Sequence, residues 1–392
     1  MAIKPSQIQA ILQNKRKYFR TFESNNLSAL DTYQAAWKTL CQASANELQD
    51  WLTAHPGNVG ARPLATPLAA NAQDQPGIHH SNLQWGSREQ SLQWVKEQLE
   101  GVTTFAVDGS QIFSSKDLSL PIALVQVGWF ENPHTSEADY TKDIELDILT
   151  PHDLKAYDPA TPAERIVNLR RFQMETERLV SYIEQVRDPD HCLVFFDGSL
   201  VATFADAYEE EARKAYVKAL LKLVRASEHH RVPLVGYVDT SYAHDLTTLL
   251  ELYVGIEGMP AVHDAQMLSR FMAWGDCTPI FQCDRTGILA DYKEQADRIT
   301  FTYLKTNQGY PARIEMPRWM HEAGITHQVL HWVRAETIVG GGYPYAIETA
   351  DQTAVLQTND RQIFFRILQD WAHSEDLQLR WSRKMMSKLR RR

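Results

Sequence analysis

The tripeptide Asp-Gly-Ser occurs twice in this chain, each time directly after a run of apolar residues. The first run is FAV before Asp108, and the second is LVFF before Asp197. Apolar, β-favouring runs followed by glycine predict buried strands that end in a turn. Each strand then delivers an aspartate to its carboxyl end, which in an α/β sheet is the edge where ligands bind. Two neighbouring carboxylates at such an edge call for a shared cation, so the pair predicts metal-dependent chemistry on a phosphate.

The rest of the apolar pattern predicts where further strands and helices lie. Apolar residues at three- and four-residue spacings predict a helical region over 1–54, and a Pro-, Ala-, Asn- and Gly-rich stretch predicts a linker or long loop over 55–86. With the DGS strands at 103–108 and 192–197, the expected elements are helices at 87–99, 163–187, 203–228, 242–252, 319–335 and 348–371 and strands at 121–130, 143–149, 233–239, 278–283, 298–305 and 311–316. Such alternation predicts an α/β sheet covered by helices.

The charge of the chain is unevenly distributed. The net charge is −9, from 40 Lys and Arg against 49 Asp and Glu, which argues against a protein that coats nucleic acid. The basic C-terminal tail, residues 373–392, differs from the body, because its last thirteen residues carry seven Lys or Arg and no acid. We expect this tail, including Arg390 and Arg391, to contact DNA phosphates; a solvated terminus is the alternative.

Neither a membrane anchor nor a disulfide framework is evident in the sequence. No run of 18 or more apolar residues occurs, and the first twenty residues have helical periodicity with scattered charge in place of a signal peptide. The four cysteines lack CxxC spacing, which predicts free thiols in a reducing compartment. We therefore expect a soluble, cytoplasmic protein.

The helix expected before the second DGS strand carries a candidate third carboxylate. Glu175 lies three residues after Phe172 and four before Leu179, at the border of the apolar face, from where it can point toward the two aspartates. Glu177 is the neighbouring alternative, turned by about 200° around the helix axis. The alternative for either glutamate is a solvent-exposed position on the helix without a role in a site.

Two later segments carry further candidate carboxylates. Asp239 ends the apolar run VPLVGYV and repeats the arrangement of a strand that delivers an aspartate, although it could instead cap a helix that begins near Tyr242. Asp351 lies early in a helix after GGYPY, beside Glu348. A first helical turn favours acidic residues through the helix dipole, so the sharper hypothesis for Asp351 is a metal ligand or a proton-handling group.

These segments, in this order, resemble the NurA family of DNA-end-processing nucleases. The resemblance rests on a DGS strand, a glutamate-bearing helix, a second DGS strand, the GYVDTS element and the late GYPYAIETAD segment, and it spans about Phe105 to Leu356. It implies a ribonuclease H-like mixed sheet flanked by helices, with an N-terminal helical extension and a nuclease domain over 87–372. It also implies an enzyme that hydrolyses DNA phosphodiester bonds with Mn²⁺ or Mg²⁺ held by carboxylates.

The resemblance assigns roles to particular residues. Asp108 and Asp197 match the two DGS aspartates of the family, and Glu175 matches its helix glutamate better than Glu177 does. Together with Asp351, these carboxylates are expected to bind the metal and to carry catalysis. The residues expected to contact DNA are Ser110, Ser199, Tyr343, Tyr345, Arg390 and Arg391, with Trp319 as a further aromatic residue that could stack on a base.

Two positions depart from the family pattern. Archaeal members have a histidine after the YP element, where this chain has Asp351, and some members have a lysine where Asp239 aligns. An oxygen ligand can replace imidazole at a manganese site, whereas a change from lysine to aspartate removes a positive charge that could contact phosphate. Both departures bear on activity more than on fold.

The family also implies partners and a biological role. The expected partner is a HerA-type hexameric ATPase, the expected working form is a homodimer, and the expected role is DNA-end resection in double-strand break repair. Because of the two departures, a non-catalytic subunit that dimerises and docks on a translocase or on DNA is the alternative. An actin-like ATPase is a third possibility, and the lack of a second adenosine-binding glycine motif counts against it.

Overall fold

A computed structural model describes residues 3–65, 68, 77–115, 118–155 and 162–382 of the chain. The chain forms two compact units, one made of Met1–Gln84 and Val238–Glu315 and the other of Trp85–Tyr237 and Met316–Arg392. We call them the N-terminal unit and the DGS unit. Within the described ranges, no helix is both long enough and apolar enough to span a bilayer.

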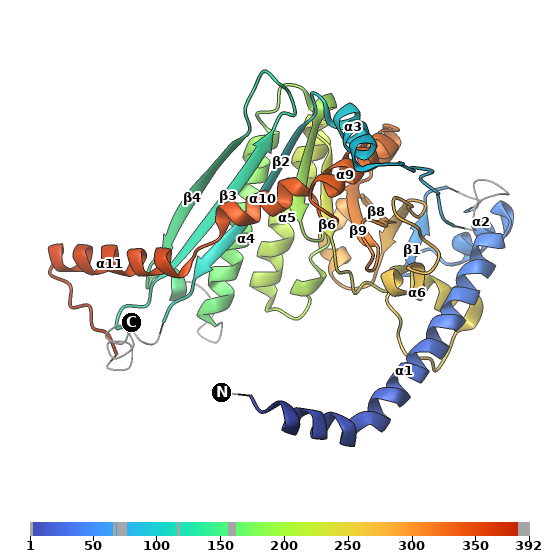
Figure 1. Cartoon of the computed structure of the whole chain (residues 1–392), viewed down its shortest axis with the longest axis horizontal. Coiled ribbons are helices and arrows are strands. Elements are labelled where there is room, and N and C mark those ends of the chain that lie inside the picture. Colours follow the sequence, from blue (N-terminus) through green and yellow to red (C-terminus); the bar gives the residue numbers. More distant parts are fainter. Residues whose placement is uncertain (1–2, 66–67, 69–76, 116–117, 156–161, 383–392) are drawn as a thin grey trace. The chain divides into compact units, whose positions relative to one another are not determined.

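The DGS unit is built on a mixed β-sheet (Figure 1). Its strands are β2 (Thr103–Ile112), β3 (Ala123–Asn132), β4 (Thr141–Leu149), β5 (Cys192–Asp197) and β6 (Leu234–Val238), in the order β6-β5-β2-β3-β4. β2, β3 and β4 form an antiparallel meander, whereas β5 runs parallel to β2 and β6 parallel to β5. The sheet is mixed and flanked by helices, as the sequence predicts, and the buried apolar runs of β2 and β5 form its centre.

Helices cover both faces of this sheet (Figure 1). The helices of the unit are α3 (Arg88–Leu99), α4 (Ala163–Ile183), α5 (Glu210–His230), α8 (Trp319–Glu322), α9 (Thr326–Val339), α10 (Tyr345–Ala354) and α11 (Thr358–Ser374). A Cβ atom at Gly109 would collide with side chains of α4, and one at Gly128 would collide with the backbone of α10. Gly128 is the cross-strand partner of Asp108, the residue before Gly109. Because successive residues of a strand point to opposite faces, α4 and α10 lie on opposite faces of the sheet.

The N-terminal unit contains the predicted N-terminal helices and a second set of strands. Its elements are α1 (Pro5–Gln42), α2 (Ala45–Ala54), β1 (Gly60–Pro63), α6 (Asp245–Leu250), α7 (Asp264–Leu268), β7 (Phe281–Asp284), β8 (Ile299–Leu304) and β9 (Ala312–Pro317). β1 pairs antiparallel with β7, and β7 with β8. The prediction of a linker was wrong over Gly60–Pro63, because pairing with β7 and an ion pair between Arg62 Nε and Asp284 Oδ2 at 2.7 Å hold this segment in a strand.

Three predicted helices have different bounds in the structure. The helix expected over 203–228 begins only at Glu210, after a loop that contains a single turn at Thr203–Ala205. The helix expected over 319–335 is divided into α8 and α9 at Gly324, which has a positive φ of 74°. The helix expected over 348–371 is divided into α10 and α11. Further short helical segments are Asp153–Lys155, Pro189–His191, Glu251–Gly255 and Ile288–Gln295.

Candidate active site

The aspartates of the two DGS motifs lie at the same level of adjacent strands. Val107 of β2 pairs with Phe196 of the parallel strand β5, so Asp108 and Asp197 come next to each other, on strands that neighbour at about 4.8 Å. The prediction that the first strand ends at Asp108 was wrong, because β2 continues to Ile112 along β3. The pairing of β2 with β5 ends at Val107 and Phe196, so Asp108 lies directly after the last paired residue of β2.

Asp108 shares its surroundings with other acidic groups. The amide of Gly109 donates a hydrogen bond to Asp108 Oδ1 at 2.7 Å, and the acidic groups of Asp197 and of Asp351 on α10 lie close enough to Asp108 to raise its pKa. Burial raises the pKa of Asp108 to about 7; the neighbouring Asp351 and Asp197 add to this rise, while the Gly109 amide opposes it. Burial and the neighbouring acidic groups therefore both favour the protonated form of Asp108.

Glu175 reaches this edge from the α4 side of the sheet. Its side chain is only 7% exposed, and burial raises its pKa to about 8, against the lowering effect of Arg171 and with a further rise from Asp108 and Asp197. Arg171 Nη1 lies 3.0 Å from Glu175 Oε1 without hydrogen-bond geometry, and Oε1 has no hydrogen-bond partner among the described residues. Gly109 leaves the space that Glu175 needs, since any larger residue would displace it.

The alternative helix glutamate points elsewhere. The side chain of Glu177 is about half exposed and pairs with Arg170 Nη1 at 3.1 Å. The two glutamates are separated by two residues on α4 and face in different directions, as the helical turn of 100° per residue requires. Of the two, Glu175 is the one that interacts electrostatically with Asp108 and Asp197.

The late tyrosine segment approaches Asp197 from the start of α10. The hydroxyl of Tyr343 donates a hydrogen bond to Asp197 Oδ1 at 2.8 Å, and its ring lies edge-on to Tyr237. The buried carboxylate of Glu336 on α9 accepts hydrogen bonds from the Ala346 amide at 2.8 Å and from the Thr104 hydroxyl at 3.0 Å. Glu336 therefore ties the first turn of α10 to β2, the strand that carries Asp108. Sequence reasoning did not single out Glu336.

The two serines of the DGS motifs have hydrogen bonds within the fold. Ser110 Oγ accepts a bond from the Leu356 amide at 3.3 Å, after the end of α10. Ser199 Oγ donates to the Val201 carbonyl at 2.9 Å and accepts from the Val201 amide at 3.1 Å. Both hydroxyls therefore stabilise the chain around the aspartates. The expectation that they contact DNA is not tested by these bonds.

The remaining predicted residues either do not line the cavity at the carboxylates or lie outside the described residues. Tyr345 is the first residue of α10 and packs edge-on against Phe130, with ring centres 5.8 Å apart. Asp239 follows β6, and burial raises its pKa. The alternative that Asp239 caps the next helix was wrong, because α6 begins at Asp245 with His244 at the cap position. Arg390 and Arg391 lie in residues 383–392, which are outside the described ranges.

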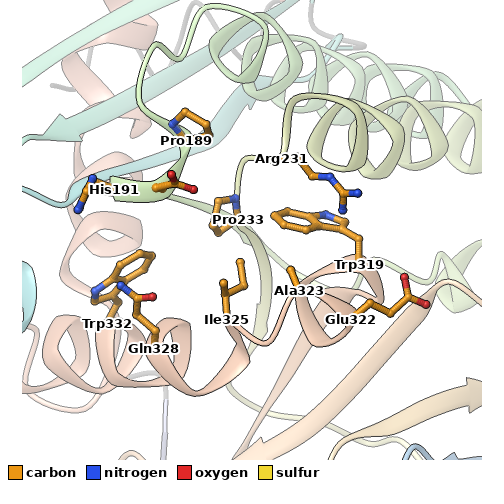
Figure 2. A pocket seen from close by; sticks show the side chains of 11 residues that line it. Pro189, His191, Arg231, Pro233, Trp319, Glu322, Ala323, Ile325, Gln328 and Trp332 are labelled. Carbon is orange, nitrogen blue, oxygen red and sulfur yellow. The ribbon is translucent and has the colours of Figure 1, made fainter.

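Trp319 was expected to stack on a base, and the structure contradicts this expectation. Its ring is buried, its Nε1 donates to Ser227 Oγ at 3.1 Å, and the guanidinium of Arg231 lies 5.2 Å from its centre. Figure 2 shows Trp319 in the wall of a cavity of about 470 Å³, together with Pro233 and Arg231. This cavity lies at the amino end of β5, roughly 17 Å along the strand from Asp197, and none of the four predicted carboxylates lines it.

A second cavity, of about 450 Å³, opens directly onto the carboxylates. Its lining includes Asp108, Glu175 and Asp197. The other lining residues are Asn168, Arg171, Phe172, Phe196, Gly198, Ser199, Phe204, Tyr208 and Tyr216. Sequence reasoning missed the aromatic part of this lining and also Arg171, although the spacing of Arg171 four residues before Glu175 is a recognisable signal.

The carboxylates have the donor chemistry of a divalent cation site without a ready-made coordination geometry. In the part of the chain that the structure describes, no group of three or more His, Cys, Asp or Glu is arranged so that it could hold a metal ion. The carboxylates come from different elements, with Asp108 on β2, Asp197 on β5, Glu175 on α4 and Asp351 on α10. The oxygen-only donor set, the raised pKa values and the unbonded Oε1 of Glu175 all fit a hard cation such as Mg²⁺ or Mn²⁺.

Comparison with known proteins gives one clear family match. A NurA domain is matched over residues 102–356, which includes the four carboxylates. No curated protein matches the sequence.

Solved structures give weaker similarities. The catalytic domain of human endonuclease V is 15% identical, with a TM-score of 0.31 over 72% of this chain and 98% of its own. The Ciona intestinalis endonuclease V, solved with a DNA that contains inosine, is 8% identical, with a TM-score of 0.22 over 71% and 96%. The Aquifex aeolicus Argonaute is 9% identical, with a TM-score of 0.23 over 65% of this chain and 28% of its own. At TM-scores this low, these likenesses say nothing about the chemistry of the site.

Proposed function

Because this chain belongs to the NurA family of nucleases, we propose that it is a divalent-metal-dependent deoxyribonuclease that hydrolyses phosphodiester bonds during DNA-end resection. The observation that carries the proposal is the group of carboxylates at the end of the β2–β5 pairing. Burial and mutual repulsion raise the pKa of Asp108 to about 7 and that of Glu175 to about 8. Acidic groups with pKa values raised this far are typical of sites that bind a cation or transfer a proton.

The residues that would hold the metal are Asp108, Glu175, Asp197 and Asp351. Oxygen ligands of this kind suit Mn²⁺ and Mg²⁺, and such a cation, when bound, would neutralise phosphate charge and lower the pKa of the attacking water. Asp351 takes the place of the family histidine in this set. Its closeness to Asp108, whose pKa it helps to raise, supports the proposal that an oxygen ligand works at this position.

Neighbouring residues would position these carboxylates. Tyr343 holds one oxygen of Asp197 by a hydrogen bond, which fixes the orientation of that side chain. Arg171 donates to the Gly109 carbonyl at 3.1 Å and lies beside Glu175, so it holds α4 against β2 where Asp108 stands. Glu336 does the same for α10 by bonding both Ala346 and Thr104. The three contacts fix the elements from which the carboxylates come.

The finer parts of the proposal rest on family membership. We propose a HerA-type hexameric ATPase as the partner, a homodimer as the working form, a role in double-strand break repair and a cytoplasmic location. DNA contacts are proposed for Ser110, Ser199, Tyr343, Tyr345 and the basic tail with Arg390 and Arg391.

The test of the enzyme proposal is DNA cleavage by the purified protein. We expect labelled single-stranded and duplex-ended DNA to be cut with Mn²⁺ and to remain intact with EDTA. Asp108→Asn, which preserves size and hydrogen bonding, should reduce the rate by a hundredfold or more, on the order of the loss of a principal electrostatic group. Equal rates for Asp108→Asn and the wild type would exclude this site as the source of activity.

One observation favours the alternative, a non-catalytic subunit. As described above, no three acidic groups converge as a metal site in the described residues, and Asp351 replaces a family histidine. The alternative predicts that the protein does not cut DNA with Mn²⁺, either alone or with the translocase. Cleavage that is lost in Asp108→Asn would exclude it.

A further inference from the structure

We propose that the cavity beside the carboxylates contains a stacking site for one unpaired nucleobase, centred on Phe204. This inference deepens the proposed function, on which it rests, by naming the substrate class: DNA with at least one unpaired base next to the phosphate that is cut. We call Phe172, Phe204, Tyr208 and Tyr216 the aromatic wall of the cavity.

Phe204 presents an exposed ring that is held in place by other rings. It is 47% exposed, whereas Tyr216 is 3% exposed and Phe172 8% exposed. The centre of the Phe204 ring lies 5.1 Å from that of Tyr216 and 5.9 Å from that of Phe172, both edge-to-face, and 6.3 Å from that of Tyr208. Edge-to-face packing fixes the orientation of an aromatic ring. The exposed face of the Phe204 ring is therefore held in a fixed orientation before a ligand binds.

A short loop connects Phe204 of the aromatic wall directly to Asp197. Phe204 lies in the loop that begins directly after Asp197, where Gly198 adopts a φ of 141° that other residues rarely take. Within this loop, the Ser199 side chain bonds to Val201, and the amide of Ala205 donates to the Ala202 carbonyl at 2.8 Å. The loop is therefore ordered, and Phe204 keeps a constant position relative to Asp197.

A nucleobase is the occupant that fits both halves of the cavity. The volume of about 450 Å³ is in the range of small-molecule sites. Its acidic half can accept a phosphate only with a cation, and its aromatic half offers a flat apolar face, so the combination matches a nucleotide with its phosphate on the carboxylates. Asn168 supplies a polar group at the same cavity: its Oδ1 accepts from Gln111 Nε2 at 3.4 Å, which leaves its amide nitrogen to donate to a base edge.

Stacking of this kind selects unpaired DNA without selecting a sequence. Every base has a π-face, and stacking on an aromatic side chain typically contributes a gain in affinity of about 5- to 150-fold per base. In a duplex, both faces of an internal base are already covered by its neighbours. The site therefore favours single strands, frayed ends and flaps over intact duplex.

The test measures binding with Ca²⁺ in place of Mn²⁺ and confirms on a gel that the probe stays intact. The probes are a fluorescein-labelled single-stranded oligonucleotide and its fully abasic counterpart. We expect the wild type to bind the normal strand about tenfold more tightly than the abasic strand. Phe204→Ala should lose this tenfold preference and bind the abasic strand as the wild type does.

Three further variants control for folding and for unspecific effects. Phe204→Leu keeps apolar volume without a ring and should behave as Phe204→Ala, whereas Phe204→Trp should retain the preference. Tyr242→Ala removes an aromatic ring that is 69% exposed outside the cavity lining and should leave binding unchanged. The fluorescence of 2-aminopurine in the strand should be quenched by the wild type, by Phe204→Trp and by Tyr242→Ala, and it should not be quenched by Phe204→Ala or Phe204→Leu.

The outcomes separate this inference from the proposed function. A base-dependent preference that disappears in Phe204→Ala supports the stacking site even if the protein fails to cut DNA. If the wild type binds the normal and abasic strands equally, or if Phe204→Ala weakens both equally, the stacking site is overturned, whether or not cleavage occurs.

Discussion

Two groups of acidic side chains, one in each unit, have opposite electrostatic surroundings. In the N-terminal unit, Arg313 Nη1 lies 2.7 Å from Asp245 Oδ2, Arg313 Nε lies 2.6 Å from Glu315 Oε1, and Arg285 also binds Asp245. We call these four residues the Arg313 cluster. In the DGS unit, Asp108 lies close to the acidic groups of Asp197 and Asp351, and Glu175 has an oxygen without a hydrogen-bond partner among the described residues.

The pKa values report this difference. In the Arg313 cluster, burial acts to raise the pKa of Asp245, but Arg313 and Arg285 outweigh it and hold the pKa below its ordinary value. In the candidate active site, burial prevails and raises the pKa of Asp108 to about 7 and of Glu175 to about 8. The same residue type is thus structural where basic partners neutralise it, and available for a cation or a proton where they do not.

The largest effect is expected from breaking the Arg313 cluster. Arg313→Met leaves the buried carboxylates of Asp245 and Glu315 without their main partner, which typically costs about 3–5 kcal/mol of unfolding free energy. Urea unfolding monitored by circular dichroism measures this loss. Arg270→Ala, which removes an exposed pair with Asp31 in the same unit, is the matched control and should cost less than about 1 kcal/mol. Similar losses for both variants would contradict the structural role of the cluster.

The next effect concerns the attachment of α10 in the DGS unit. Glu336→Ala leaves the Thr104 hydroxyl and the Ala346 amide without their acceptor, at an expected cost of about 1–3 kcal/mol. Glu336→Gln can still accept from the Ala346 amide and should recover most of the stability. The KM and kcat of DNA cleavage should separate in Glu336→Ala, with kcat reduced more because Asp351 on α10 is displaced. A variant that loses stability but keeps kcat would show that Glu336 is structural only.

The candidate active site should respond to pH in the sense opposite to the Arg313 cluster. A carboxyl group whose folded pKa is raised contributes stability that is complete below its ordinary pKa near 4 and is lost as pH rises through 7 to 8. Asp108→Asn removes one such group, so in EDTA at pH 8 it should stabilise the protein by about 1–2 kcal/mol, a rise in Tm of a few degrees. At pH 5 the difference should be small. A destabilising Asp108→Asn at pH 8 would mean that a basic partner neutralises the site.

The smallest effect is expected from the tyrosine that holds Asp197. Tyr343→Phe removes one hydrogen bond to a charged group, which is usually equivalent to about 1–2 kcal/mol, and so should reduce kcat by roughly tenfold with little change in Tm. Tyr345→Phe is the control, because it removes a hydroxyl and keeps the ring that packs against Phe130. An equal response of the two variants would remove Tyr343 from the site.

Local patterns in the sequence were sufficient to predict much of the DGS unit. The apolar runs before Asp108 and Asp197 do form buried strands, because four or more consecutive β-favouring residues are stable only inside a sheet. The position of Glu175 at the border of the apolar face of its helix correctly indicated a buried side chain. The mixed α/β sheet followed from the alternation of strands and helices.

Features that depend on distant partners could not be predicted in this way. Continuation of β2 past Asp108 depends on β3, and the strand at Gly60–Pro63 exists only because β7 pairs with it. Phe204 was expected within a helix, but the positive φ of Gly198 directs the chain into a loop that places its ring in the cavity. Trp319 has an aromatic ring that could stack on a base, yet its neighbours bury this ring at the other cavity. In each case, a contact between segments far apart in the sequence decides the outcome.

Binding of Mn²⁺ to the purified protein, measured by isothermal titration calorimetry at pH 7, tests the central claim most directly. If the acids of the DGS unit are kept without sufficient basic partners in order to hold a cation, the wild type should bind Mn²⁺ and gain thermal stability from it, and Asp108→Asn should lose both effects. Arg313→Lys, a change confined to the other cluster, should leave Mn²⁺ binding in place. Equal Mn²⁺ binding by Asp108→Asn and the wild type, or none by either, would contradict the account.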